Sequence, residues 1–441
     1  MASKKKAVSK GAKGKAAEAK DKKEAPVRKA PVVSRAAAPG PVLSISREPT
    51  TTSSLSIKSD AERQKALATL VNQLEGNLIP ASQLGNVYAL RRPSGIVELD
   101  VALGGGFPAG GACMLSGPYN SGKSWLLFRT MAMQQQLYGR SFMGALHIAE
   151  TQLPYDQMRQ AGIRVEVPDS VIRQYIQRDV ELGMPPWPAE KIAEWKQQVG
   201  SIEIIGGGTG EHVLQSVLEC VKANVFNIIG VDSISSLMPQ RDADKDMDDE
   251  QARAARAIMM GKFWDKYVPH VNRGVNLTSL LFTQQVRQSD SAYGLDWVVT
   301  GGEATKHYKL IDVLMYPGAQ IKKTIQGREY TIGKKTNFRT LKGKAGTHDN
   351  IKGEFNWYYP EFFPGSVDVH GDLIVYAMQQ GILIRTNKGL QLLNALTREP
   401  VEAMYAPDDQ SLKECLQADF DFELEFRRHV MAAAGLQCLY R

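Results

Sequence analysis

The sequence predicts an α/β fold, in which a mostly parallel sheet is flanked by helices, with a helix before it and a small α+β region after it. Two observations carry this prediction. From about residue 94, short apolar runs alternate with helical segments, which is typical of strands buried in a parallel sheet. A glycine-rich loop also joins one of these apolar runs to a helix. The expected strands are residues 112–116, 145–149, 202–205, 227–232, 279–283 and 313–316, and the expected helices are residues 123–138, 211–223 and 251–267.

Four regions are expected along the 441 residues. Residues 1–58 are rich in Lys, Ala, Pro and Ser and cannot bury enough apolar surface to become ordered, so they predict a disordered basic tail. Residues 59–90 carry a helix with leucines at helical spacing, which could dock on a neighbouring subunit or on its own body. Residues 91–368 form the core, with an inserted helical excursion at 169–200, and residues 369–441 form a small C-terminal domain.

The net charge of +7 belongs to the tail. Residues 1–50 hold 13 basic and 4 acidic residues, a balance of +9, which leaves −2 for the rest of the chain. Two interpretations of the tail stay open: a solvated segment, or a segment that grips nucleic acid phosphates without sequence preference.

The sequence argues against several classes of protein. It has no run of about 18 apolar residues, so neither a transmembrane helix nor a membrane partner is predicted. No apolar stretch follows the charged start, so no secretory signal is predicted. The four cysteines form no CxxC pair and predict reduced thiols in a cytoplasmic protein rather than a zinc site or a disulfide framework.

The segment GPYNSGKS satisfies the pattern G-x-x-x-x-G-K-[ST] of a phosphate-binding loop. An apolar strand enters it and a helix leaves it, so backbone N–H groups can curl around the β-phosphate while the helix N-terminus adds its positive dipole end. Lys123 is expected to reach the β- and γ-phosphates, and the Ser124 hydroxyl is expected to ligate Mg²⁺. We therefore expect ATP and Mg²⁺ as ligands. The expected nucleotide contacts are Gly117, Pro118, Tyr119, Asn120, Ser121, Gly122, Lys123, Ser124 and Trp125.

Three further polar residues stand at the ends of predicted strands. Asp232 ends the run NIIGVD and is expected to hold the Mg²⁺ through a water, although it could also be a simple turn residue. Glu150 ends the run LHIAE, where a carboxylate could activate the attacking water or, alternatively, cap the next helix. Gln285, in LLFTQQVR, could sense which nucleotide is bound.

Residues 287–305 are expected to form a loop that carries glycines and two aromatic residues. This loop could contact DNA through Arg287, through backbone amides and through the aromatic faces of Tyr293 and Trp297. An ordinary surface loop with two partly buried aromatics is the alternative.

Nine sequence blocks stand in order along the chain: QKALA (64–68), SGIVELDVALGGGFPAGG (94–111), GPYNSGKS, HIAE, TGEH (209–212), VDSISSLMP (231–239), AAR (254–256), FTQQVR and TGGEATKHY (300–308). Together these blocks resemble those of the RecA family of recombinases, from about residue 60 to residue 368. They occur in that family's order and at consistent spacing, which is far more specific than one phosphate-binding loop. The phage UvsX-type branch of the family is also a candidate.

The resemblance implies a RecA-type P-loop ATPase core with catalytic residues from two subunits. Beside Lys123, it implies that Glu150 is the catalytic carboxylate and that Gln285 is the γ-phosphate sensor. It also implies that Lys342 and Lys344 reach the ATP of the adjacent subunit, so that hydrolysis depends on filament assembly.

The resemblance further implies two DNA-contacting loops. The first, residues 240–251, is acidic, so its assignment rests on position, with Arg256 supplying a cation behind it. The second, residues 287–305, includes Thr300, Gly301 and Gly302.

Three positions depart from the family's pattern. Glu303 stands where bacterial members usually carry Asn, which adds negative charge beside DNA. His307 replaces a usual Phe in the segment that couples ATP to the state of the filament. Tyr155 lies two positions before the family's adenine-stacking tyrosine and is the nearest match to it.

The implied protein is a DNA-dependent ATPase that polymerises on single-stranded DNA as a helical homo-oligomer. Its filament would exchange strands with homologous double-stranded DNA during recombination and repair. Mediator or single-strand-binding proteins would be further partners, in the cytoplasm of a bacterial cell or of a phage-infected host. Two alternatives stay open: a hexameric helicase or ring ATPase with the same core, and an ATP-switched DNA-binding scaffold without strand exchange.

Overall fold

The computed structural model describes residues 61, 65, 67–70, 90–149, 155–164, 169–196, 200–243, 252–271, 276–289, 296–299, 302–344, 346–363 and 365–436. The chain divides into two compact units, Met1–Leu70 and Val71–Arg441. In the first unit the described residues are helical and exposed, and the Thr69 hydroxyl donates to Lys65 O (2.9 Å). The predicted tail, residues 1–58, lies outside the described residues.

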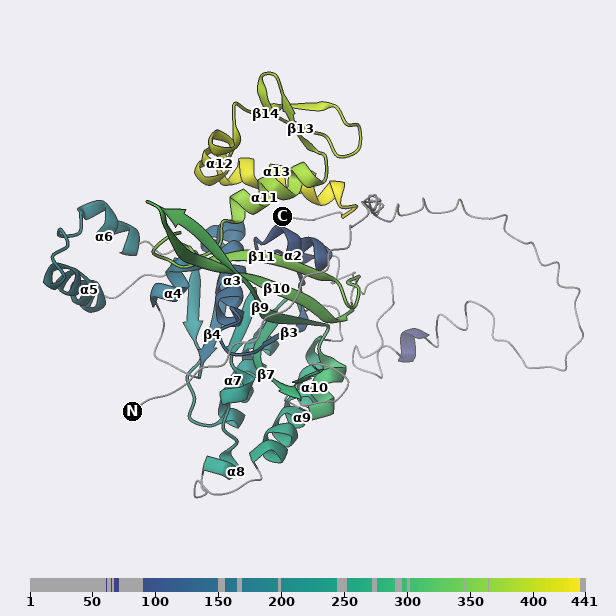
Figure 1. Cartoon of the computed structure of the whole chain (residues 1–441). Coiled ribbons are helices and arrows are strands. Elements are labelled where there is room, and N and C mark those ends of the chain that lie inside the picture. Colours follow the sequence, from purple (N-terminus) through teal and green to yellow (C-terminus); the bar gives the residue numbers. More distant parts are fainter. Residues whose placement is uncertain are drawn as a thin grey trace, which may run out of the picture. The chain divides into compact units, whose positions relative to one another are not determined.

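A large sheet is the centre of the second unit (Figure 1). Its strands are β3 (Gly111–Gly117), β4 (Met143–Ile148), β5 (Ser201–Ile204), β6 (Ile228–Asp232), β7 (Ser279–Ser289), β8 (Asp296–Val299), β9 (Ile311–Ile325), β10 (Arg328–Gly343) and β11 (Lys352–Tyr358). Within the described residues, these nine strands follow the order β11-β10-β9-β3-β7-β6-β4-β5, with β8 beside β7. The run from β9 to β5 is parallel, whereas β10, β11 and β8 pair antiparallel. The predicted mostly parallel sheet is confirmed.

Each predicted strand is present, but the predictions at 279–283 and 313–316 are too short. β9 continues past the core as a two-stranded ribbon with β10, in which Lys323 faces Tyr330 across the strands. This ribbon is largely exposed, so it lacks the apolar run from which a buried strand is predicted.

Helices pack on both faces of the sheet. In β3, Cys113 and Leu115 belong to one core cluster with residues of α3 (Lys123–Tyr138). Ala112 and Met114 belong to a second cluster with residues of α7 (Gly210–Ala223) and α9 (Ala252–Val271). Because successive side chains of a strand point to opposite faces, β3 is buried from both sides. The three predicted helices are found here, and α9 continues further than predicted.

The remaining elements frame this core. None of the described helices is both long enough and apolar enough to span a membrane. The short strands β1 (Arg91–Arg92) and β2 (Phe107–Pro108) pair antiparallel. The other helices are α2 (Val97–Ala102), α4 (Tyr155–Gln160), α5 (Asp169–Glu181), α6 (Ala189–Lys196), α8 (Gln240–Ala243), α10 (Gly302–Tyr308), α11 (Val369–Gln379), α12 (Asp409–Ala418) and α13 (Phe420–Ala433), with 3₁₀ turns at Gly139–Ser141 and Ile234–Ser236.

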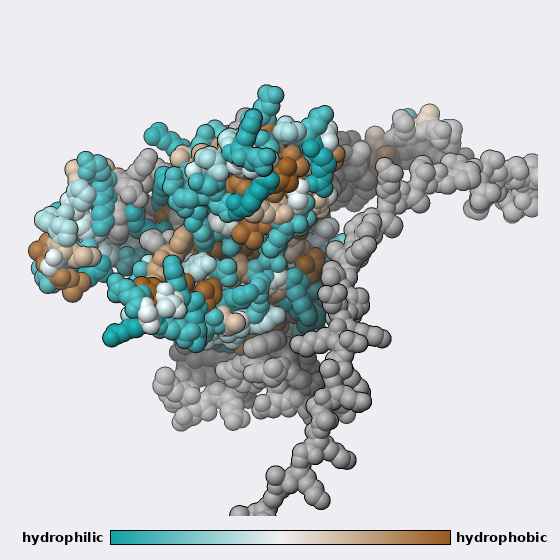
Figure 2. Space-filling view, turned by 45° about the horizontal axis from the view of Figure 1, so that its top comes forward, coloured by the Kyte–Doolittle hydropathy of each residue, from teal (hydrophilic) through white to brown (hydrophobic). Residues whose placement is uncertain are grey.

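The predicted helical excursion contains α5 and α6. Its small core centres on Trp187, which packs near Tyr155 of α4 and whose indole N–H donates to Asp179 (2.7 Å). The Lys191 ammonium lies over the Trp187 ring, 3.8 Å from its centroid. Figure 2 shows an apolar patch on α5, α6 and the residues between them, which we call the α5–α6 hairpin. The exposed apolar side chains of the hairpin are Val180, Leu182 and Met184.

The residues after 368 form a small α+β region, as predicted. The helices α11, α12 and α13 accompany an antiparallel sheet of β12 (Leu383–Thr386), β13 (Gly389–Leu393) and β14 (Pro400–Ala406). Its apolar cluster extends to Val97 of α2 and Met133 of α3, so it is packed on the main core.

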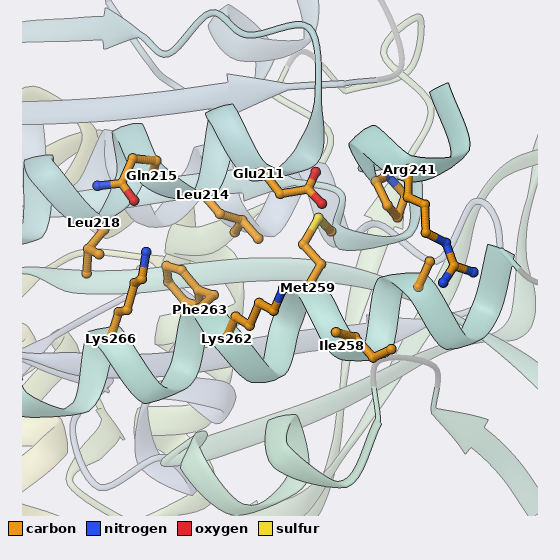
Figure 3. A pocket seen from close by; sticks show the side chains of 12 residues that line it. Glu211, Leu214, Gln215, Leu218, Arg241, Ile258, Met259, Lys262, Phe263 and Lys266 are labelled. Atoms are coloured by element: carbon orange, nitrogen blue, oxygen red, sulfur yellow. The ribbon is translucent and has the colours of Figure 1, made fainter. Parts of the chain in front are cut away.

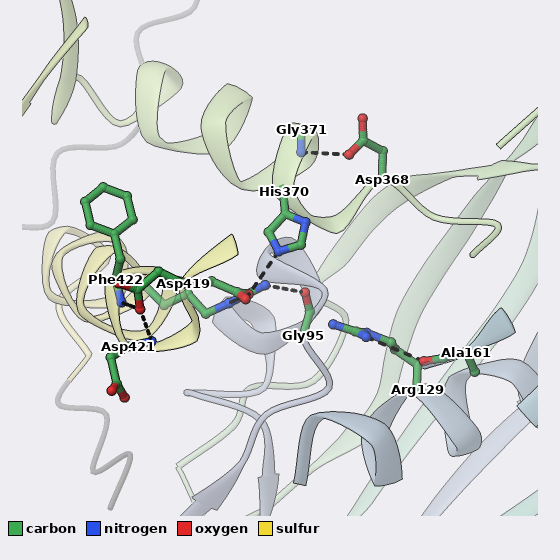
Figure 4. A network of polar contacts seen from close by, with 11 residues as sticks. Gly95, Arg129, Ala161, Asp368, His370, Gly371, Asp419, Asp421 and Phe422 are labelled. Atoms are coloured by element: carbon green, nitrogen blue, oxygen red, sulfur yellow. Dashed lines mark hydrogen bonds and ion pairs between the residues drawn. The ribbon is translucent and has the colours of Figure 1, made fainter. Parts of the chain in front are cut away.

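Arg427 of α13 ties this region to the core. Figure 4 shows the network of polar contacts at this junction, with His370 and Gly95 labelled. Its side chain is fully buried, and its guanidinium pairs with Glu423 (2.7 Å) and donates to Gly95 O (3.0 Å). His370 Nε2 lies 3.2 Å from the second Glu423 oxygen. Burial would raise the pKa of Glu423, but Arg427 and His370 outweigh it and hold the pKa at about 2. Glu423 therefore stays ionised at neutral pH.

We expect Glu423→Gln to lower the free energy of unfolding at pH 7 by about 3–5 kcal/mol, because the Arg427 charge would stay buried without its carboxylate. Urea unfolding followed by circular dichroism measures this. The folded pKa lies below the ordinary value of 4.5, so this advantage of wild type is present above pH 4.5 and is lost as pH falls towards 2. The control is Glu425→Gln, whose ion pair with Arg428 is nearly half exposed, and little change is expected. Equal losses in both variants would contradict this account.

Candidate functional site

A pocket of about 540 Å³ opens at the carboxyl ends of the parallel strands. Its walls include the loop after β3, Ile148 of β4, Asp232 of β6 and Gln285 of β7. Carboxyl ends of parallel strands meet at one edge of a sheet, which is where α/β proteins bind ligands. The pocket is therefore the candidate nucleotide site.

The phosphate-binding loop has the backbone that its motif requires. Asn120 and Gly122 have positive φ values of 57° and 88°. A Cβ atom on Gly117 would lie 2.4 Å from Met315 O, so only glycine fits there. The Lys123 ammonium donates to Pro118 O (2.7 Å), which folds this side chain back over the loop, where it can meet phosphates.

Two oxygen-bearing side chains in the pocket suit Mg²⁺. Ser124 lies in the first turn of α3, and Asp232 ends β6. Asp232 accepts a hydrogen bond from the Thr283 hydroxyl (2.5 Å), which orients its carboxylate. A hydroxyl and a carboxylate are hard oxygen ligands of the kind that Mg²⁺ takes together with substrate phosphates. The residues present therefore fit a magnesium–nucleotide complex.

Gln285 lies beside the start of the phosphate-binding loop. In the β3–β7 pairing it is the direct partner of Gly117, and it lines the same pocket. Its backbone N–H donates to the Ser235 hydroxyl (3.1 Å), which joins β7 to the segment after β6. Segments far apart in sequence thus bring Lys123 and Ser124 together with Asp232 and Gln285. The predicted contacts Tyr119, Asn120, Ser121, Gly122 and Trp125 line the same pocket.

The two lysines assigned to a neighbouring subunit's ATP do not line this pocket. Lys342, in β10, donates through its ammonium to Lys306 O and to His307 O (2.9 Å), the carbonyls at the end of α10. Burial, together with the charges of Lys344 and Lys309, lowers the pKa of Lys342 to about 8. Lys344 follows β10 and is exposed.

Some predicted residues cannot be located. Glu150, Tyr293, Thr300 and Gly301 lie outside the described residues, as do the side chains of Arg287 and Trp297.

The prediction of a loop over 287–305 was wrong at several positions. β7 continues to Ser289, β8 pairs antiparallel with its end, and Gly302 begins α10. The run Trp297–Val299 is aromatic and β-branched, which favours a strand once a partner edge is available.

Arg256 and Tyr155, two of the predicted site residues, each contact another described part of the chain. Arg256 Nε donates to Leu237 O (3.2 Å) and thereby ties α9 to the segment after β6. Tyr155 packs with the α5–α6 hairpin, whereas Gln157 and Gln160 of α4 line the nucleotide pocket, together with Tyr359.

Sequence reasoning missed a buried ion pair behind the phosphate-binding loop. Lys309 pairs with Asp312 of β9, and Asp312 accepts a 2.7 Å hydrogen bond from the hydroxyl of Ser116, the residue before Gly117. Lys309, Asp312 and Ser116 are all almost fully buried. The only signal in the sequence is the three-residue spacing of a Lys and an Asp, which is ordinary in exposed segments.

A second hollow of about 310 Å³ lies between α7 and α9 (Figure 3). Apolar side chains such as Leu214, Met259 and Phe263 line it, with Glu211 and Lys262 beside them. It contains no glycine-rich loop, so the phosphate chemistry is assigned to the pocket at the strand ends.

Comparison with known proteins finds one family repeatedly. The family model of the RecA N-terminal domain matches residues 188–361. The chain is 29% identical to "Protein RecA" of Gloeothece citriformis over 283 residues, 63% of this chain and 68% of that protein. It is 28% identical to "Protein RecA" of Petrotoga mobilis, over 65% of this chain and 68% of that protein. It is 25% identical to "Protein RecA" of Bdellovibrio bacteriovorus over 388 residues, 86% of this chain and 88% of that protein.

We expect Lys123→Ala to weaken ATP binding at least about tenfold, because a charge-assisted contact to the phosphates is removed. Titration with a fluorescent ATP analogue measures the Kd. Lys388→Ala, at an exposed turn of the C-terminal region, serves as the control and should bind like wild type. Unchanged affinity in Lys123→Ala would remove the pocket as the nucleotide site.

Proposed function

We propose that this chain is a RecA-type recombinase, an ATP-dependent protein that polymerises on single-stranded DNA and pairs it with a homologous duplex; its similarity to RecA proteins supports this proposal. The observation that carries this proposal is the convergence of Lys123, Ser124, Asp232 and Gln285 on one pocket at the strand ends. Mg·ATP, when bound there, supplies the phosphoanhydride bond that is hydrolysed.

Each residue of the pocket has one proposed task. Lys123 holds the β- and γ-phosphates, and Ser124 and Asp232 hold the Mg²⁺. Ala149, the residue after β4, donates its N–H to Asp232 O (2.8 Å), and the residue that follows it in the sequence is a glutamate. We assign that residue, Glu150, as the general base that takes a proton from the attacking water.

The purine end of the nucleotide is proposed to lie towards α4 and β11. Gln157 and Gln160 offer amides and Tyr359 offers an aromatic face on that wall of the pocket. Tyr155, the earlier candidate for stacking, packs with the α5–α6 hairpin, so Tyr359 is the better candidate.

DNA is proposed to contact the segments 240–251 and 287–305, with Arg256 and Arg287 supplying cations. Such contacts need to grip only the backbone and stacked bases, because base pairing supplies sequence specificity. Lys342 and Lys344 are proposed to meet the ATP of the next subunit. Lys342 holds the end of α10, the helix whose first residues belong to the second DNA segment, so its movement to a γ-phosphate would link ATP to DNA.

Filament assembly is proposed to use the N-terminal segment 59–90, in which Leu67 and Leu70 are each about half exposed. The protein is proposed to act on DNA in the cytoplasm of a bacterial cell or a phage-infected host, with mediator or single-strand-binding proteins as further partners.

We expect single-stranded DNA to stimulate ATP hydrolysis at least several-fold, because the site is completed by a neighbouring subunit on the DNA. A phosphate-release assay with and without single-stranded DNA measures this. Negative-stain images with a slowly hydrolysed ATP analogue should show helical filaments. Rings would point to a ring ATPase, and absence of DNA stimulation would count against a recombinase.

We expect Glu150→Gln to bind ATP and DNA like wild type while kcat falls about 100-fold or more, because the general base is lost. Steady-state hydrolysis and DNA binding are measured on the same preparation. The matched control is Glu402→Gln in β14 of the C-terminal sheet, which should keep full turnover. Normal turnover in Glu150→Gln would overturn the catalytic assignment.

A further inference from the structure

Lys334 of β10 contacts the phosphate-binding loop of its own chain. Its ammonium donates to Asn120 O (2.5 Å), and its side chain lines the nucleotide pocket. Asn120 is a non-glycine loop residue with a left-handed backbone (φ 57°), at the point where the chain turns towards Gly122 and Lys123. A strand distant in sequence therefore holds the most constrained turn of the loop.

Lys334 and its neighbour in the strand, Lys335, differ in their charge partners. Lys335 is ion-paired with Glu354. Within the described part of the chain, no carboxylate forms an ion pair with Lys334. Lys334 is also half-buried, and this burial lowers its pKa. A partly desolvated cation with no carboxylate partner, beside an anion-binding loop, adds to the positive field of that loop.

The wall that presents Lys334 is built for this contact. Lys334 and Trp357 of β11 are direct partners in the antiparallel pairing, so their side chains share one face, and both line the pocket. Trp357 meets Trp125 of α3 edge to face (centroids 5.0 Å apart, 74°). A Cβ atom on Gly122 would lie 3.5 Å from the Trp357 ring, so this ring closes over the loop. Lys335, next in the strand, lines a different hollow, together with Glu98 and Glu354.

We propose that Lys334 is a positioning residue for the nucleotide, which holds the phosphate-binding loop through Asn120 O in the curve that accepts phosphates. This rests on the proposed ATP binding. Lys334 acts before chemistry, because its contact is with the backbone of the loop. Its loss therefore weakens the binding of ADP and ATP alike and leaves turnover at saturating ATP unchanged.

The test measures the Kd of fluorescent ADP and ATP analogues, KM and kcat for full-length wild type and variants. Lys334→Ala is expected to raise Kd and KM about tenfold, with kcat within about twofold of wild type. Lys334→Arg, which keeps the cation and its donors, is expected to restore most of the affinity. Lys335→Ala is the matched control, because Lys335 does not line the nucleotide pocket, and it should bind like wild type.

Three outcomes would overturn the inference. If wild type binds nucleotide and Lys334→Ala binds it with the same affinity, this inference is overturned and the proposed function is not. A lower melting temperature without nucleotide and equal affinity loss in Lys334→Ala and Lys334→Arg would show a merely structural role. Failure of wild type to bind nucleotide at all would overturn the proposed function and this inference with it. If Lys334→Ala does not fold, Lys334→Met, which keeps the stem and removes the ammonium, gives the same comparison.

Discussion

Parallel pairing of the central strands is the constraint on which the rest of the structure depends. Because β3, β7, β6 and β4 run in the same direction, their carboxyl ends meet at one edge. That edge sets Gln285 beside Gly117 and Ile148 beside Asp232, although these residues are far apart in sequence. No loop rearrangement is needed to assemble the pocket, since the register of the sheet has already aligned its walls.

Buried charges reinforce this arrangement at points where apolar packing alone would not specify a position. Asp312 receives Lys309 from the segment after α10 and Ser116 from the strand that leads into the phosphate-binding loop. Arg427 and Glu423 similarly hold α13 against Gly95. Buried ion pairs of this kind add little net stability compared with apolar packing. Hydrogen bonds and ion pairs depend on direction, so they fix which side chains meet. Here those side chains lie next to the nucleotide pocket and in the C-terminal region.

The antiparallel edge of β10 and β11 gives the site a wall that a purely parallel sheet would lack. At one position β10 sets Lys334 against the phosphate-binding loop, and further along it sets Lys342 against the end of α10. A single strand thus touches both the nucleotide pocket and α10, whose first residues belong to the second proposed DNA segment. In the proposed function, this strand connects the nucleotide site with a DNA contact.

The sequence by itself determined the parallel α/β core, the phosphate-binding loop and the strand-end residues Asp232 and Gln285. These depend on local pattern: apolar runs, helical spacing, and glycines where the backbone turns left-handed. Only the tertiary structure decided that Lys334 and Trp357 face the loop, that Tyr155 packs with the α5–α6 hairpin, and that residues 287–289 continue a strand. Such facts depend on which strand edges and side chains meet across long sequence separations. Local propensity does not depend on those distant partners, so a local sequence pattern does not predict them.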